Sequence, residues 1–328
     1  MPIFTPTHPF HAAPGLEDPH AQTLHAALVR RPRLSGLQRE RVWLKDGDFL
    51  DLEVLETSAR DAPLLLLLHG LEGSSRSGYI RALLAGAARR GWGAVALNFR
   101  SCSGEANRLP RFYHSGETGD VRELLGRLGA RGWGPRFAVG FSLGANVLLK
   151  LLGEDGDRSP ITAAAAISTP FDLQASADAL DLATGVGSVY RRVFLRSLKR
   201  KALEKARRFP DAFDVARIRA ATGVREFDDV VTAPIHGFAS AEDYYRRSSS
   251  GPMLGAIRRP TLLLSSADDP LAPGGLPESA RTSPWLHGLQ TEHGGHVGFV
   301  EGQAWRPRWW ADAQILRFLE QHLQSGAS

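Results

Sequence analysis

The sequence GFSLG, residues 140–144, places a serine between two glycines at the junction of two different local patterns. Before it, the short apolar run Phe137 to Val139 predicts a strand buried on both faces; after it, Ala145 to Leu152 is apolar and helix-favouring. A serine on such a strand-to-helix turn is typical of a nucleophile elbow. Glycines two residues before and after Ser142 are needed because the strand and the helix approach too closely for a Cβ atom. Alone, this pentapeptide also fits an ordinary turn, so the residues that follow decide its meaning.

A carboxylate and a histidine follow Ser142 in the chain order of an α/β-hydrolase triad, which is serine, then acid, then histidine. Asp268 and Asp269 come shortly after the apolar run 261–265, and His296 lies in a glycine-rich loop nearer the C-terminus. A serine hydroxyl needs a base to accept its proton, and an imidazole pKa of about 6.5 suits that task at neutral pH. We therefore expect Ser142 to be the nucleophile and His296 the base.

The acid of the triad has two candidates. Asp269 is favoured because it begins the turn that continues into Pro270 and Leu271, where many hydrolases carry their acid, and Asp268 remains the alternative. His293 is the alternative to His296 as the base. Both histidines together could bind a metal, but no third ligand lies at a suitable spacing, so we expect no metal.

Acyl transfer also needs hydrogen-bond donors for the oxyanion. In this fold one backbone N–H comes from the residue after the nucleophile, here Leu143, and the other comes from the loop after the third strand. The apolar run Leu64 to Leu68 predicts that strand, which ends at His69 and Gly70. We expect Leu71 to supply the second N–H, with Gly70 allowing the backbone to turn inward.

The length and the alternation of patterns indicate the fold class. With 328 residues, 43% of them hydrophobic, the chain is long enough for one large α/β domain with an insertion. Strand-like and helix-like segments alternate without a linker, which predicts an α/β-hydrolase fold on a mostly parallel, doubly wound sheet. Residues 1–40, rich in His and Pro, are expected to form an arm packed along this single domain of residues 1–328. The helix-rich stretch at about 170–259 is expected to form a cap over the carboxyl edge of the sheet, where ligands bind.

Composition excludes several other classes of protein. The longest apolar run, residues 62–68, is far too short to cross a bilayer, and the N-terminus lacks the features of a signal peptide, which favours a cytoplasmic protein. A single cysteine, Cys102, excludes an internal disulfide and fits a reducing compartment. The glycine-rich segment 70–78 lacks both the lysine of a P-loop and the spacing of a dinucleotide fingerprint, so no cofactor is expected.

The net charge of +5 is modest for this length, but basic residues concentrate between Arg191 and Arg208. Apolar residues such as Phe194 and Leu198 are interleaved with them, a pattern compatible with an amphipathic basic helix in the cap. Such a helix is either a solvated face or a surface that attracts anionic substrates or associates weakly with membranes. No recognition motif accompanies the charge, so a nucleic acid is not an expected partner. The sequence makes no prediction of the oligomeric state.

Longer strings occur along nearly the whole chain: PHAQT (19–23), HGLEGSSRSG (69–78), NFRSCSGEANRLPRFYHSGET (98–118), GFSLGAN (140–146) and GGHVGF (294–299), with Asp228, Gly237, Phe238 and Asp243 to Tyr245 among the residues between the last two. In these strings the chain resembles the YheT/EMB-type branch of the α/β-hydrolase superfamily, which includes bacterial esterases and mammalian α/β-hydrolase-domain lipid hydrolases. The resemblance implies a triad of Ser142, Asp269 and His296 and the hydrolysis of carboxylic esters. Ser101 stands where relatives often have glycine, and we expect no counterpart of the membrane-spanning N-terminus of the mammalian members.

Together these features predict a serine hydrolase that needs no cofactor and cleaves carboxylic esters with short, medium or lipid-like acyl groups through an acyl-enzyme on Ser142. Two other functions remain open: an acyltransferase or thioesterase with the same nucleophile, and a non-catalytic ligand-binding protein on the same scaffold. A complete triad argues against the second of these. The segments Asn107 to Pro110 and Tyr113 to Thr118 are expected either to shape the site or to brace its loops.

Overall fold

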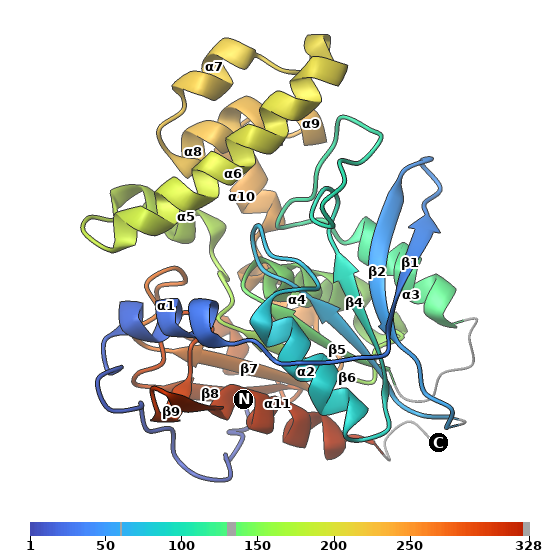
Figure 1. The fold of residues 1–328 in the computed structure, drawn as a ribbon, viewed down its shortest axis with the longest axis vertical. Coiled ribbons are helices and arrows are strands. Elements are labelled where there is room, and N and C mark those ends of the chain that lie inside the picture. Colours follow the sequence, from blue (N-terminus) through green and yellow to red (C-terminus); the bar gives the residue numbers. More distant parts are fainter. Residues whose placement is uncertain (60, 130–135, 324–328) are drawn as a thin grey trace.

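The computed structural model describes residues 1–59, 61–129 and 136–323, and within these ranges the chain forms an eight-stranded sheet and a two-stranded hairpin (Figure 1). The large sheet has the strand order β1-β2-β4-β3-β5-β6-β7-β8; β1 and β2 are antiparallel to their neighbours and the other strands are parallel. The strands are β1 (Leu37–Trp43), β2 (Phe49–Leu55), β3 (Leu64–Leu68), β4 (Gly93–Asn98), β5 (Arg136–Phe141), β6 (Ala163–Ile167), β7 (Thr261–Ser266) and β8 (Leu286–Thr291), with the hairpin β9 (Val300–Gln303) and β10 (Arg306–Trp309). This is the mostly parallel, doubly wound sheet that the sequence predicted.

The central strands are apolar throughout because both faces of the sheet are covered by helices. All five leucines of β3 are buried, and this strand pairs with β4 on one side and β5 on the other. One face packs against α3 (Gly119–Gly129) and α4 (Leu143–Asp155), and the other against α2 (Gly78–Ala88) and α11 (Trp310–Glu320). The sheet is therefore buried on both faces beneath the loops at its carboxyl edge.

Six helices lie between β6 and β7 in the sequence and gather at one end of the molecule (Figure 1). They are α5 (Leu173–Leu182), α6 (Gly187–Arg208), α7 (Val215–Ala220), α8 (Val224–Phe227), α9 (Ala233–His236) and α10 (Ala241–Ser248). Helix α6 contains the whole basic cluster, and its buried face shares a small apolar core with α7 and α8. We call these helices the cap below, although the division of the chain into core, arm and cap stays a prediction. Across the described ranges, no helix is both long enough and apolar enough to span a bilayer.

The N-terminal region contains a helix that the sequence analysis did not identify. A helix, α1 (Pro19–Val29), lies within the expected arm of residues 1–40, and β1 already begins at Leu37. The Asp18 side chain accepts the N–H of Ala21 at the start of α1, and Pro19 occupies the first helical turn, where its missing N–H has no consequence. The expectation of an arm packed along the domain stays a prediction, and the structure adds a helix to it that the sequence analysis did not identify.

Candidate active site

Ser142 lies on the turn between β5 and α4 in a strained backbone conformation. Its φ of 53° and ψ of −120° are rare for any residue with a side chain. A Cβ atom on Gly140 would lie 2.6 Å from the Cα atom of Ala145, and one on Gly144 would lie 2.5 Å from the carbonyl oxygen of His69. Gly140 is thus required by the close approach of strand and helix that the spacing indicated, whereas Gly144 is required by the end of the neighbouring strand β3, a contact that the sequence did not indicate.

His296 and Asp269 form the hydrogen-bonded pair that the sequence predicted. Nδ1 of His296 lies 2.9 Å from each carboxylate oxygen of Asp269. The buried Asp269 also accepts the backbone N–H groups of Leu271 (2.9 Å) and Ala272 (3.0 Å), which fix its orientation. Because Nδ1 faces the carboxylate, Nε2 of His296 is left to act on a substrate or a nucleophile.

Asp268, the alternative acid, has different partners. It accepts the N–H of Gly295 at 2.9 Å and lies 3.4 Å from Nδ1 of His293, the alternative base. Asp268 therefore holds the backbone of the loop that carries His296 rather than the imidazole itself. These contacts favour Asp269 and His296 over the two alternatives.

Short links between strand ends bring the histidine loop to the serine turn. The N–H of Ser142 donates to the carbonyl of Ile167 at 2.9 Å, and the next residue, Ser168, accepts the N–H of Val297 at 3.0 Å through its hydroxyl. Val297 directly follows His296. The hydroxyl of Ser142 has no hydrogen-bond partner among the described side chains, His296 included; such contacts are often loose before a substrate binds.

Helix α1 supports the same loop from the other side, a role that the sequence analysis missed. The N–H of His296 donates to the Thr23 hydroxyl at 2.9 Å. The buried Gln22 side chain accepts the N–H of Val300 (2.7 Å) and donates to the carbonyl of Val300 (3.1 Å). Gln22 and Thr23 belong to the PHAQT string (residues 19–23), which the family resemblance includes but for which the sequence predicts no function.

The backbone amides after β3 single out Leu71 as a free donor. The N–H of Gly70 donates to the Tyr79 hydroxyl (3.0 Å), that of Glu72 to the Tyr113 hydroxyl (2.8 Å), and that of Gly73 to the carbonyl of Gly70 (3.0 Å). Within the described part of the chain, the N–H of Leu71 has no such partner.

This free donor lies beside the nucleophile. A Cβ atom on Gly70 would approach the Cβ atom of Ser142 to 3.1 Å. Leu143, at the positive end of α4, is the first residue of its helix, so its N–H has no acceptor within the helix. The geometry is therefore compatible with an oxyanion site formed by Leu71 and Leu143.

His69 orients this loop, and its role was also missed from the sequence. Its buried ring accepts the N–H of Phe99 at Nε2 (3.1 Å), so Nδ1 carries the hydrogen and donates to the carbonyl of Gly70 (2.7 Å). Burial lowers the pKa of His69 to about 4, which keeps the ring neutral. In a trans peptide the carbonyl and the next N–H point in opposite directions. Fixing the Gly70 carbonyl therefore fixes the direction of the Leu71 N–H.

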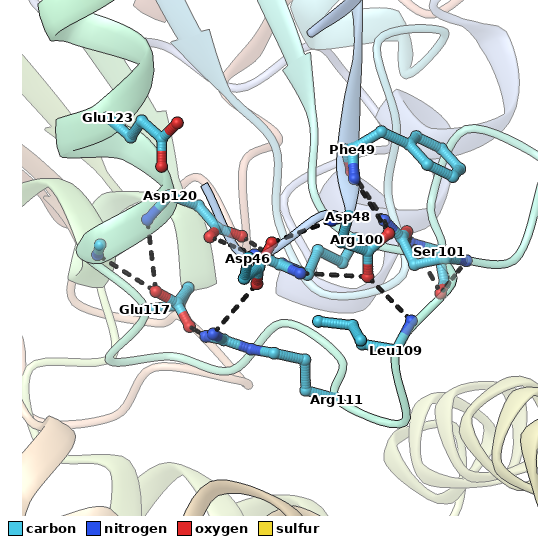
Figure 2. A network of polar contacts seen from close by, with 12 residues as sticks. Asp46, Asp48, Phe49, Arg100, Ser101, Leu109, Arg111, Glu117, Asp120 and Glu123 are labelled. Atoms are coloured by element: carbon cyan, nitrogen blue, oxygen red, sulfur yellow. Dashed lines mark hydrogen bonds and ion pairs between the residues drawn. The ribbon is translucent and has the colours of Figure 1, made fainter. Parts of the chain in front are cut away.

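A buried ionic network explains the segment Asn107 to Pro110 (Figure 2). Arg100, almost fully buried, pairs with Asp120 at 2.6 Å and with Asp48 at 3.1 Å. Asp48 accepts the backbone N–H groups of Arg108 and Leu109, at 2.9 and 3.1 Å. Buried charges are tolerated when all their hydrogen-bonding groups are matched in this way. The contacts show this segment bracing a loop next to β4.

The segment Tyr113 to Thr118 contributes to a cluster with metal-ligand donors. Ligand atoms of His114, Glu117 and His236 lie within 4.8 Å of one another, and His236 belongs to cap helix α9. However, the N–H of Gly116 donates to Nδ1 of His114 at 3.1 Å, so the other ring nitrogen carries the hydrogen, and Glu117 is paired with Arg111. Mainly because of burial, the pKa of His114 is lowered to about 3 and that of His236 to about 2. The contacts fit a neutral packing contact between core and cap better than a cation site.

The fold and the proposed site together define an α/β-hydrolase, and comparison with known proteins agrees. The α/β hydrolase fold family model matches residues 63–303. The chain is 40% identical to YheT of Escherichia coli (strain K12), named as a candidate esterase, over 95% of this chain and 93% of YheT. It is 35% identical to the monoacylglycerol lipase of Saccharomyces cerevisiae over 79% of this chain, and spans 59% of that protein.

A solved structure shows the same fold at much lower sequence identity. The esterase Pf2001 of Pyrococcus furiosus aligns with 90% of this chain and 100% of its own, with a TM-score of 0.56 at 14% identity, a likeness of fold alone. This chain belongs to the α/β-hydrolase family, in the branch that includes YheT. The fold class and the family resemblance predicted from the sequence are confirmed.

Proposed function

We propose that this protein is a serine-dependent carboxylic ester hydrolase whose triad is Ser142, Asp269 and His296. The observation that carries the proposal is the His296–Asp269 pair, whose loop is linked through Ser168 to the strand end that accepts the N–H of Ser142. Ser142 itself has the strained conformation of a nucleophile elbow. Relatives named as a candidate esterase and as a monoacylglycerol lipase support the class of reaction.

In the proposed mechanism, the Ser142 hydroxyl attacks the ester carbonyl while Nε2 of His296 accepts its proton. Asp269 stabilises the resulting imidazolium, and the N–H groups of Leu71 and Leu143 stabilise the negative charge on the former carbonyl oxygen. When the tetrahedral species collapses, the alcohol leaves with the proton from His296 and the acyl group stays on Ser142. Water then attacks the acyl-enzyme in the same way and releases the carboxylic acid. No cofactor is needed for these steps.

We also propose that lipid-like esters are among the substrates and that the cap associates weakly with membrane surfaces. On α6, Arg196, Arg200 and Arg207 lie along one side of the helix and have no hydrogen-bond or ion-pair partner among the described residues. Leu182 at the end of α5 and Val193 on α6 are 80% and 59% exposed. Free guanidinium groups beside exposed apolar side chains are suited to an anionic lipid surface. A cytoplasmic location remains part of this proposal.

The test is labelling with a fluorophosphonate probe, comparing the wild type with Ser142→Ala, followed by turnover of p-nitrophenyl esters from acetate to palmitate. Labelling of the wild type alone would establish an activated Ser142, and the preferred chain length would measure the acyl pocket. An acyltransferase or thioesterase would also be labelled, but it would prefer an added alcohol acceptor or a thioester over the plain esters. If the folded wild type is neither labelled nor active on any ester, the proposal fails and a ligand-binding role replaces it.

A further inference from the structure

Glu72 connects the loop after β3 to the cap, at the position next to Leu71. Its carboxylate accepts a hydrogen bond from the Tyr113 hydroxyl (2.9 Å) and pairs with the Lys201 ammonium of α6 (2.8 Å). The Ser197 hydroxyl, one turn earlier on α6, donates to its other oxygen. The Glu72 and Lys201 side chains are only 8% and 15% exposed, so this contact is shielded from water. Two positions on one face of the cap helix thus hold a single side chain of the loop.

The charge on Lys201 is maintained despite burial. Burial acts to lower its pKa, but Cys102 and the Glu72 carboxylate together hold the pKa above the ordinary lysine value. The Lys201 ammonium also lies 3.3 Å from the Cys102 sulfur, whose own pKa burial raises to about 11. An ion pair shielded in this way is costly to break on one side only, because the remaining charge stays buried without a partner.

The backbone of Glu72 is itself strained, which argues that its side chain is needed there. Its φ of 54° lies in the left-handed region, which a glycine adopts without penalty and which costs other residues about 1–3 kcal/mol. Such a conformation persists only where surrounding contacts hold it. At Glu72 the Tyr113 hydroxyl holds the N–H, and Lys201, Ser197 and Tyr113 hold the carboxylate.

We propose that Glu72, Lys201 and Ser197 form a latch through which cap helix α6 supports, from the following peptide, the Leu71 N–H orientation that His69 fixes, and that Lys201 and Ser197 are positioning residues for acyl transfer. The latch acts on the Leu71–Glu72 peptide, which follows Leu71, while His69 fixes the Gly70–Leu71 peptide, which carries the Leu71 N–H. Contact between α6 and the loop therefore stabilises the oxyanion-binding geometry, and displacement of the cap would disturb it. This inference rests on the proposed ester hydrolase function.

The test uses the full chain with three variants that weaken the latch and one matched control. Lys201→Met keeps a long apolar side chain but removes the charge, Glu72→Gln keeps the shape, and Ser197→Ala removes one hydroxyl. Lys199→Met is the control: Lys199 is also on α6, but its ammonium donates to the carbonyls of Arg219 (2.6 Å) and Ala221 (2.8 Å) within the cap.

We expect Lys201→Met and Glu72→Gln to lower kcat about 10- to 30-fold with little change in KM, below the 10²–10³-fold effect of deleting an oxyanion donor outright. The inhibition constant of phenylboronic acid, which forms an anionic tetrahedral adduct with an activated serine, should rise in parallel. Ser197→Ala should show the same trend with a smaller size. Combining Lys201→Met with Glu72→Gln should lower kcat no further than the stronger single variant.

The outcomes separate this proposal from the one on which it rests. If the wild type is not labelled at Ser142, the ester hydrolase function fails, whatever the variants do. If the wild type is active and the folded variants keep its kcat and boronate affinity, or Lys199→Met loses as much as Lys201→Met, the latch is refuted. Should Lys201→Met fail to fold in a thermal unfolding scan, Ser197→Ala and Glu72→Gln decide the question by the same two readouts.

Discussion

Replacing Asp269 by asparagine tests the proposed triad at the level of a single proton. The backbone N–H groups of Leu271 and Ala272 both donate to Oδ1 of Asp269. In the variant, the amide oxygen has to keep these two contacts because an amide nitrogen there would face two donors. The amide nitrogen then takes the place of Oδ2, which lies 2.9 Å from Nδ1 of His296, and donates a hydrogen to Nδ1 in competition with the amide oxygen at the Oδ1 position, which is equally close. In the tautomer that the amide N–H favours, Nε2 of His296 carries the hydrogen and cannot accept the proton of Ser142.

The expected loss is large because the base has the wrong tautomer rather than the wrong position. A serine-protease triad with the same change loses about 10⁴-fold in kcat, equivalent to about 5.5 kcal/mol of transition-state stabilisation. We expect Asp269→Asn to lose 10³- to 10⁴-fold in kcat on p-nitrophenyl butyrate, with slower labelling of Ser142 by a fluorophosphonate. Activity should recover partly at high pH if hydroxide replaces the base.

Asp268→Asn is the matched control. Asp268 accepts the N–H of Gly295 through one oxygen, and an asparagine retains that oxygen, so kcat should stay within about threefold of the wild type. The reasoning is refuted if Asp268→Asn is the more damaged variant, or if Asp269→Asn keeps more than a tenth of the wild-type kcat while remaining folded.

Three further outcomes follow from the structure. Gly140→Ala should lower the free energy of unfolding by about 3 kcal/mol in urea titrations, because its Cβ would meet the Ala145 backbone at 2.6 Å. Wild-type stability in this variant would contradict the close contact. The free energy of unfolding should fall as the pH drops from 7 to 4, because burial lowers the pKa of His69 to about 4 and the unfolded chain therefore binds the proton first. One pKa unit is worth about 1.4 kcal/mol, so this residue accounts for a loss on the order of 3 kcal/mol. A urea midpoint that stays constant over this pH range would contradict the prediction. Sedimentation with anionic vesicles should weaken in an Arg196→Glu, Arg200→Glu double variant and in high salt, whereas binding equal to that of the wild type would remove α6 from the proposed membrane surface.

The sheet and the serine turn could be predicted because their signals are local in the sequence. Strands such as β3 and β7 are uninterrupted runs with every residue buried, as expected for parallel strands covered on both faces. The requirement for Gly140 arises from contacts within its own turn, whereas Gly144 is required by the carbonyl oxygens at the end of β3, which is remote in the chain. The order of acid and histidine after Ser142 added the long-range information that an isolated motif lacks.

Helix α1 could not be predicted by apolar periodicity because its buried face is largely polar. Gln22 and Thr23 are buried, and their side chains bond to the backbone around His296 and Val300, more than 270 positions away. A hydrophobic stripe marks a helix that packs on a core. A helix that packs by hydrogen bonding to a loop leaves no such stripe, so its sequence looks irregular.

The strained backbone conformations at the carboxyl edge of the sheet are the other feature of the site that the sequence did not indicate. Among the described residues, seven non-glycine positions have positive φ, and all but Asp61 lie after one of the strands β3, β4, β5, β6 and β8: Glu72, Ser101, Ser142, Ser168, Val297 and Phe299. Each such residue costs about 1–3 kcal/mol, so none would hold this conformation in an isolated loop. They are held by contacts among themselves and with neighbouring elements, such as the Val297 N–H on the Ser168 hydroxyl and the Glu72 carboxylate on Lys201. These contacts join segments that are remote in the chain. The geometry of the site therefore depends on the assembled fold, even for residues that belong to a recognisable local sequence motif.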